Sequence, residues 1–295
     1  MNLSLGPLLY SCPRADTLAF YGQAAIWPVA RIYLGESVCS RRHLLRLPDW
    51  LALAKELAAA GKEVVLSSQT LIESESDLKM LRRIIGDGHF LVEANEWGAV
   101  RLLSEAGVPF VAGSTLNVYN HETLELLAGL GARRWLPPVE MSGAALKSLL
   151  GHAPAAIETE VFAYGKLPLA YSARCFTARH FNLPKDDCQF RCLDYPDGLP
   201  LATREGEPFL TLNGIQTQSA GVYNLIGELP SLRELGVASL RLSPQSRHMG
   251  RIVEAFQQAL EGAEIPADLP RLMPGPAVDG YWHGRAGLEY GASSC

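Results

Sequence analysis

The chain lacks the features that assign proteins to several common functional classes. Its 26 basic residues are scattered among 31 acidic ones, and the net charge of −5 disfavours non-specific nucleic-acid binding. No stretch approaches the roughly 18 consecutive apolar residues of a membrane span. The opening MNLSLGPLLYSC lacks the basic start of a signal peptide and is typical of a strand. We therefore expect a cytoplasmic protein whose cysteines are thiols or ligands and not disulfides.

Several catalytic and cofactor motifs are also missing. The chain has no H-E-x-x-H helix of a metalloprotease, no G-x-S-x-G nucleophile turn and no G-x-G-x-x-G dinucleotide turn. The C-x3-C-x2-C spacing of radical-SAM enzymes is absent as well. His180 is the only histidine in the loop that carries Cys175, Cys188 and Cys192, and a lone loop histidine is most often a solvated surface residue. Proteolysis is therefore disfavoured.

What the chain does contain is a regular alternation of short apolar runs with helical patterns. This alternation predicts parallel strands joined by right-handed crossovers, and eight such units predict an α/β fold of the (β/α)8 TIM-barrel type, a single domain over 1–295. An open doubly wound sheet is the alternative, but no dinucleotide turn supports it. The predicted strands are LSLGPLLY, ARIYLG, EVVLSS, HFLVEA, PFVAG, RRWLPP, IETEVFAYG and ASLRLSP.

A long insertion interrupts this pattern after the seventh strand. It covers residues 166–218, far more than an ordinary βα loop, and contains a strand-like FLTLNG. After it, VYNLIGELPSLRELG has a helical pattern, and residues 262–295 form a C-terminal extension. Long loops with content of their own are usually functional.

Four cysteines form an unevenly spaced set. Cys39 follows the second strand, whereas Cys175, Cys188 and Cys192 all lie in the insertion after the seventh. In a barrel both loops open on the C-terminal face, where active sites lie. Cys12 follows the first strand and shares this face as an additional thiol, and Cys295 is the last residue.

The spacing of these thiols favours one kind of ligand without excluding others. A structural zinc site is usually built from two C-x2-C knuckles, and the closest pair here is Cys188 with Cys192, a C-x3-C spacing. An iron–sulfur cubane needs only convergent thiolates and suits the spacing better. Free thiols in a loop remain the alternative.

Other polar residues stand at predicted strand ends and could bind a ring oxygen or a small oxygen donor at the barrel mouth. Each could equally cap a helix or bond a neighbouring backbone group. They are Glu36, Glu93, Asn117, Glu140, Asn213, Gln216, Arg241 and Ser243. Arg174 and Arg179 flank Cys175, and we expect them to offset the negative charge of a cubane.

The stretch from Glu160 to Cys175, EVFAYGKLPLAYSARC, resembles the signature of the collagenase-like peptidase family of unknown catalytic type. That signature is roughly E-x-F-x-H-G-x-x-C-x-x-Y-S-G-x-C. Tyr164 replaces its histidine, Pro168 replaces its first cysteine and Ala173 replaces a glycine. Because that cysteine is a cluster ligand in most members, the fourth thiolate must come from elsewhere, and Cys39 fits the need.

In the replacement of that cysteine by Pro168, the chain resembles one branch of the family, the branch that acts in ubiquinone biosynthesis. LPLAYSARCFTAR, PKDDCQFRC, SLGPLLY, VPFVAGSTLNVYN, LNGIQT, RLSPQ and GYWHGRAGLE all resemble that branch. The resemblance implies a 4Fe-4S cluster held by Cys39, Cys175, Cys188 and Cys192. It also implies a heterodimer with the sister protein UbiU, a UbiT-like lipid carrier, and oxygen-independent hydroxylation of a ubiquinone precursor in anaerobic growth.

The residues alone leave three functions open. The chain could be a subunit of an oxygen-independent ring hydroxylase, an electron-transfer or scaffold partner without an active site, or a collagenase-like hydrolase. A partner would need an apolar surface, for which the candidates are Phe181, Phe190, Tyr281 and Trp282. For Tyr281 and Trp282, packing in the core is an equal alternative.

Overall fold

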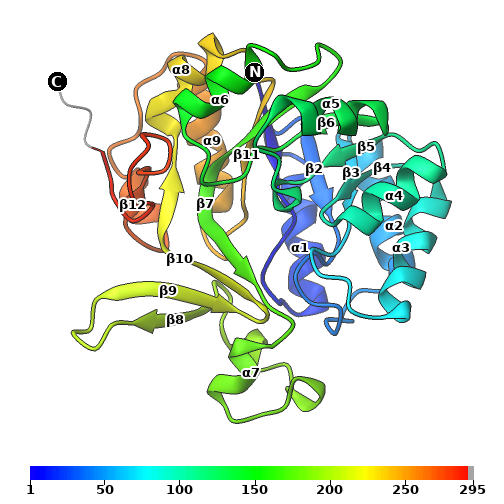
Figure 1. The fold of residues 1–295 in the computed structure, drawn as a ribbon. Helices are drawn as coiled ribbons and strands as arrows, with labels where there is room; N and C mark the ends of the chain where they lie inside the picture. Colours follow the sequence, from blue (N-terminus) through cyan, green and yellow to red (C-terminus); the bar gives the residue numbers. More distant parts are fainter. Residues whose placement is uncertain (292–295) are drawn as a thin grey trace.

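The computed structural model describes residues 1–291 and contains a closed barrel of eight parallel strands with helices on its outer surface (Figure 1). The predicted (β/α)8 fold is confirmed, and each of the eight predicted runs contains one barrel strand. The barrel strands are β1 (Asn2–Leu5), β2 (Arg31–Leu34), β3 (Glu63–Ser67), β4 (Leu91–Ala94), β5 (Phe110–Ala112), β6 (Ala132–Trp135), β7 (Glu158–Tyr171) and β11 (Ser239–Leu242).

The barrel closes between its first and last strands. β11 pairs in parallel with β1, for example Leu3 with Leu240, and on its other side with β7, for example Val161 with Leu240. Every other neighbouring pair along the chain is also parallel. The carboxyl ends of all eight strands therefore open on one face.

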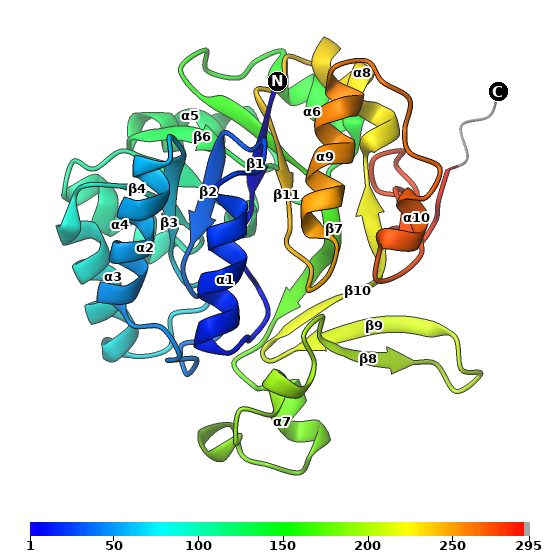
Figure 2. The same cartoon turned by 180° about the vertical axis from the view of Figure 1, so that it is seen from behind.

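Helices connect successive strands and cover the barrel. They are α1 (Arg14–Ala24), α2 (Leu47–Ala59), α3 (Glu75–Asp87), α4 (Trp97–Glu105), α5 (His121–Gly129), α6 (Gly143–Leu150), α8 (Leu229–Glu234) and α9 (Met249–Leu260). Side chains of Ser74, Asn120 and Ser142 accept backbone N–H groups at helix starts, as their residue types predict. Figure 2 shows α1 and α9 beside β1 and β11.

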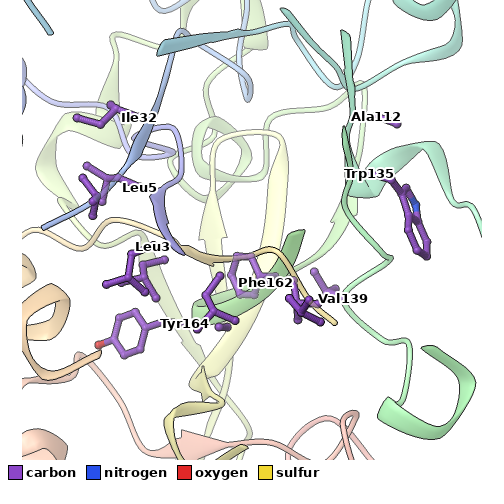
Figure 3. Close-up of a cluster of buried hydrophobic side chains, with 14 of the residues drawn as sticks. Leu3, Leu5, Ile32, Ala112, Trp135, Val139, Phe162 and Tyr164 are labelled. Atoms are coloured by element: carbon purple, nitrogen blue, oxygen red, sulfur yellow. The ribbon is translucent and has the colours of Figure 1, made fainter. Parts of the chain in front are cut away.

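The main core lies between the strands and the helices. Leu3, Leu5 and Ile32 project from β1 and β2, and Trp135 is fully buried behind β6 (Figure 3). A second, smaller core fills the barrel itself with Tyr33 and three aliphatic side chains, Val65, Val111 and Leu136. Burial of apolar surface on both sides of the strands explains why strands such as Glu63–Ser67 carry consecutive apolar residues.

Charged side chains occupy the rest of the barrel interior. Arg241 Nε donates to Glu160 Oε1 at 2.9 Å, and its guanidinium stacks over the Tyr33 ring. Arg241 also pairs with Glu93. Nearer the amino ends of the strands, Arg31 and Arg134 share two partners, Glu63 and Glu158. The buried carboxylates are therefore paired, as burial of charge requires.

The insertion does not start where the sequence predicts. β7 continues past the barrel to Tyr171 because its second half pairs antiparallel with β10 (Gln216–Asn224). Both predicted boundaries, 166 and 218, thus fall inside strands. β8 (Leu199–Ala202) and β9 (Pro208–Asn213) complete a sheet below the barrel in Figure 1, and FLTLNG is a strand as predicted.

The sequence predicts a helix that begins at residue 222, and this prediction is wrong for the first residues. Residues up to Asn224 belong to β10, a 3-10 turn follows at Ile226–Glu228, and only then does α8 begin. The apolar residues at helical spacing are buried, but as members of a strand and a short helix. Long-range pairing with β7 overrides the local pattern.

The C-terminal extension packs onto the barrel. It contains α10 (Leu269–Leu272) and β12 (Ala277–Val278), which pairs with β10. Trp282, expected as a candidate partner contact, is only 7% exposed, and its Nε1 donates to Glu228. Across residues 1–291, no helix is both long and apolar enough to span a bilayer.

Candidate metal centre at the barrel mouth

Cys39 lies in the loop that follows β2, and two neighbours fix its direction. Glu36 Oε1 accepts the backbone N–H groups of Val38 and Cys39, each at 3.0 Å. The Cys39 carbonyl accepts the N–H of Arg42 at 3.0 Å, which closes a turn. The Cys39 side chain is buried in a small apolar cluster that also includes Cys175. The loop therefore presents this thiol toward the insertion.

Cys175 begins the short helix α7 (Phe176–His180), which leaves β7 at the barrel mouth. Its sulfur accepts the backbone N–H of Ala178 at 3.4 Å, so the thiol acts as the helix N-cap. The helix is tied to the turn between β9 and β10, because Phe176 N donates to Gly214 O and Thr177 Oγ1 accepts from Gly214 N. The small sheet thus positions Cys175.

Cys188 directly follows the 3-10 turn Lys185–Asp187, and Cys192 lies in a second 3-10 turn, Arg191–Asp194. Phe181 forms the core of this loop: the Arg191 guanidinium stacks 4.4 Å from its ring centre and Tyr195 lies 6.2 Å away. The contacts between aromatic and cationic side chains give order to a segment with few aliphatic residues.

Two ion pairs dock the insertion against the barrel. Arg41 Nη1 bonds Asp186 at 2.6 Å, and Lys185 pairs with Glu73 from the loop after β3. Lys185 also donates to the Ala173 carbonyl at 2.9 Å. The loops after β2, β3 and β7 therefore meet at one place.

The structure brings the four cysteines together at that place. Cys39 and Cys175 share an apolar contact cluster, and Cys175 lies close enough to Cys188 and Cys192 for their charges to interact. Arg42 is buried in the same loop as Cys39, and its backbone N–H donates to the Cys39 carbonyl. Segments more than 130 residues apart along the chain thus form one group of thiols.

Burial raises the pKa of two of these thiols, Cys39 and Cys175, and keeps both protonated until a cation replaces the proton. Burial raises the pKa of Cys39 to about 11, and Arg42 offsets part of that rise. Burial also raises the pKa of Cys175, against the hydrogen bond from Ala178. A metal that binds these sulfurs must displace their protons, so its affinity would increase with pH.

No group of three or more His, Cys, Asp or Glu side chains in residues 1–291 is arranged to hold one metal ion. A cubane takes one thiolate at each of four corners, so its ligands need not converge on one point. The four thiols come from two segments, the loop after β2 and the insertion after β7. Four thiols are the donor set that a cubane takes.

Cys12 is half-buried in an open pocket next to the Cys39 loop, whose lining includes Tyr10, Glu36, Arg42 and Trp50. Burial raises the pKa of its thiol to about 11. Cys295 lies outside the described residues.

The other polar residues at the strand ends are occupied by neighbours. Glu93 accepts from Ser67, Asn95 and Arg241, so it belongs to the barrel network. Asn213 donates to the carbonyl of Leu9. These contacts agree with the alternative stated above, that such residues bond neighbouring groups of the protein and not a ligand.

The remaining predicted residues also have local roles. Gln216 donates to the Tyr171 hydroxyl at 2.6 Å, Glu140 accepts from Tyr119, and Asn117 adopts a left-handed conformation after a 3-10 turn. Ser243 is buried, with its N–H bonded to the carbonyl of Tyr164.

The arginines next to the thiols differ from those expected. Arg174 and Arg179 are both exposed, whereas the buried arginine in the Cys39 loop is Arg42. Sequence reasoning missed Arg42. The available signal was its position three residues after Cys39, in the run CSRR, which follows a strand and therefore faces the barrel mouth.

Comparison with known proteins identifies one family and several solved structures of low sequence identity. The model for peptidase family U32 matches residues 19–268. The solved U32 peptidase Mk0906 is 12% identical, with a TM-score of 0.47 over 83% of this chain and 93% of its own. The tryptophan synthase A-subunit of Pyrococcus furiosus is 12% identical, with a TM-score of 0.45 over 88% of this chain and 94% of its own. Dihydropteroate synthase of Thermus thermophilus is 13% identical, with a TM-score of 0.45 over 88% of this chain and 92% of its own.

Proposed function

The chain belongs to peptidase family U32, and within that family we propose that it is a UbiV-like iron–sulfur subunit of an oxygen-independent hydroxylase that acts on a ubiquinone precursor. The observation that carries this proposal is the group of four thiols at the barrel mouth. Cys39 and Cys175 share a contact cluster, and Cys188 and Cys192 lie beside Cys175.

In this proposal Cys39, Cys175, Cys188 and Cys192 hold a 4Fe-4S cluster. A bound cubane would accept and release single electrons. With four protein thiolates the cluster has no open iron, so its part is electron transfer or structure and not direct ligation of the substrate. The hydroxyl oxygen would come from water or an organic donor, because molecular oxygen is absent in anaerobic growth.

Partners complete the proposal. We propose a heterodimer with UbiU and delivery of the apolar precursor by a UbiT-like lipid carrier, in the cytoplasm. Exposed apolar side chains in the insertion support a docking role for that part of the chain. They are Phe176, Phe190, Leu201 and Phe209.

Peptidase activity, which the family name suggests, has no observation in its favour here. His180 is exposed and packs edge-on against Phe181. No hydrogen bond within residues 1–291 joins a histidine ring to the side chain of a serine, threonine or cysteine. Such a bond is the usual sign of an activated nucleophile.

Ubiquinone content in cells tests the proposed function. A strain without its own copy of the gene would be grown without oxygen, with plasmids for the wild-type chain, Cys175→Ala or Cys295→Ala. We expect the wild type and Cys295→Ala to restore ubiquinone and Cys175→Ala to leave a precursor that lacks a ring hydroxyl. With oxygen, all three strains should contain ubiquinone. Normal anaerobic ubiquinone in the strain without any plasmid would contradict the proposal.

A further inference from the structure

The fold holds the four thiols to different degrees, and two of them are fixed firmly. Cys39 and Cys175 contact a buried aliphatic cluster that includes Val38 and Ile215. Backbone hydrogen bonds add to this packing, because Glu36 accepts the N–H of Cys39 and the turn between β9 and β10 bonds the start of α7. These two thiols are therefore fixed relative to the barrel.

The other two thiols, Cys188 and Cys192, lie in a segment that is packed loosely, residues 182–194. No residue from 179 to 198 is buried. Figure 1 shows α7 and the loop that follows it at the lower edge of the molecule, away from the helices around the barrel. Segments with few buried contacts open at a low cost in free energy. The 3-10 turns of this segment are closed by local backbone bonds, whose donors are Asp187, Arg191 and Leu193.

The backbone of this segment is also strained. Five non-glycine residues of 1–291 have a positive φ, and three of them lie here, with φ between 50° and 55°: Asn182, Gln189 and Phe190. The left-handed region is unfavourable for residues with a Cβ, most of all for bulky ones such as phenylalanine. Strained residues persist only where surrounding contacts offset their cost. The observed conformation of residues 182–194 therefore depends on contacts from outside the segment.

Those contacts include two ion pairs with other barrel loops. Arg41 Nη1 and Nη2 donate to the Asp186 carboxylate at 2.6 Å and to its carbonyl at 3.1 Å. Lys185 pairs with Glu73 and also donates to a backbone carbonyl of the insertion. All four side chains are partly or largely exposed. Salt weakens pairs of this kind because counterions screen exposed charges.

Resting on the proposed function, we propose that residues 182–194 form a strap that opens to admit iron and sulfide to the thiols and closes over the bound cluster. The pairs Arg41–Asp186 and Lys185–Glu73 hold the strap closed. Opening unties its 3-10 turns and withdraws Cys188 and Cys192, while the two fixed thiols stay in place. The strain in the closed strap and the exposure of both ion pairs keep the opening within reach under ordinary conditions.

Amide hydrogen exchange of the metal-free protein tests the strap without a cluster, at the three turn donors named above. We expect exchange there to be at least about threefold faster in about 1 M salt than in about 0.1 M salt, because the ion pairs are screened, while exchange in α9 is unchanged. Lys185→Glu places a second carboxylate beside Glu73 and should give the same increase at low salt. Addition of Glu73→Lys to that variant restores opposite charges and should slow exchange again.

The control is Arg82→Gln, which removes an exposed pair in α3 that does not touch the strap. It should match the wild type. Wild-type exchange in Lys185→Glu, or no effect of salt on the wild type, would overturn the proposal.

The role in cluster loading has its own readout. Protein loaded with iron and sulfide should release iron to a ferrous chelator faster as Lys185→Glu than as Arg82→Gln. Equal release by the two variants would overturn the loading role even where exchange is faster. Absence of iron and sulfide from the wild type would instead refute the proposed function, and the exchange rates would still decide whether the strap opens.

Discussion

The carboxylate of Glu36 accepts the backbone N–H of Cys39 at 3.0 Å, so an acidic side chain fixes the loop that carries a predicted ligand. The same oxygen accepts the N–H of Val38. Mutation of a residue that orients a metal ligand typically lowers metal affinity by about 10- to 100-fold. The structure therefore gives Glu36 a role that can be tested by removal of its oxygen atoms.

We expect Glu36→Ala to contain less than half of the wild-type iron and sulfide, because the Cys39 loop loses its acceptor. Glu36→Gln keeps an amide oxygen at the same place and should retain the cluster. Colorimetric iron and sulfide assays on protein made without oxygen check both variants. Full iron content in Glu36→Ala would show that the loop holds its shape without this contact.

The barrel interior yields a prediction about stability. Replacement of Arg241 by Met leaves Glu160 and Glu93 in the barrel without their main cation. Loss of one partner of a buried ion pair typically costs about 3–5 kcal/mol. Urea unfolding followed by circular dichroism should show a loss of that size for Arg241→Met.

A surface pair provides the control for this variant. Arg82 bonds Glu75 at 2.6 Å, but both side chains are largely exposed, so Arg82→Met should leave the urea midpoint unchanged. Equal midpoints for Arg241→Met and Arg82→Met would mean that the barrel charges do not stabilise the fold.

Glycine at 143 is expected to be required for docking of the C-terminal extension. A Cβ added there would lie 2.8 Å from the Trp282 ring. Gly143→Ala must push the indole aside, and such overpacking costs about 1–3 kcal/mol. In α1, by contrast, a Cβ at Gly22 would meet nothing within 4 Å, so Gly22→Ala should stabilise the protein by about 0.5–1 kcal/mol. Opposite shifts in Tm by calorimetry confirm this account, and equal shifts refute it.

The raised pKa of Cys12 predicts how its reactivity changes with pH. Only the thiolate reacts with iodoacetamide, and burial raises the pKa of Cys12 to about 11. Below that pKa the thiolate fraction, and hence the alkylation rate, should increase about tenfold per pH unit. Mass spectrometry of the modified peptide between pH 7 and 10 measures the rate. A plateau that begins near pH 8 would show that the pKa of the thiol is not raised by its surroundings.

The barrel was predictable because its signals are local. Runs such as EVVLSS carry consecutive apolar residues that suit a strand buried on both faces, and each predicted barrel run overlaps a strand. The error at VYNLIG shows the limit of this approach. Val222, Leu225 and Ile226 have helical spacing, but pairing between β10 and a prolonged β7 decides the structure there, and pairing partners are not visible in local periodicity.

The candidate site was only partly predictable for a similar reason. Cysteine spacing and the loop order point to Cys39 and the insertion, because those residue types are rare and the topology is simple. Arg42 was missed because its two strongest partners, Leu9 and Asn213, lie 33 and 171 residues away. Arg174 and Arg179 were expected instead from closeness in sequence, which does not place a side chain in space.

The iron and sulfide content of the anaerobically purified chain tests the central claim most directly. We expect about four irons and four sulfides per chain, as a cubane requires, with a broad brown absorbance that dithionite bleaches. Alanine at Cys39, Cys175, Cys188 or Cys192 should lower both counts, while alanine at Cys12 should leave them unchanged. A wild-type chain with one zinc and no sulfide, or an equal loss in Cys12→Ala and Cys39→Ala, would contradict the account.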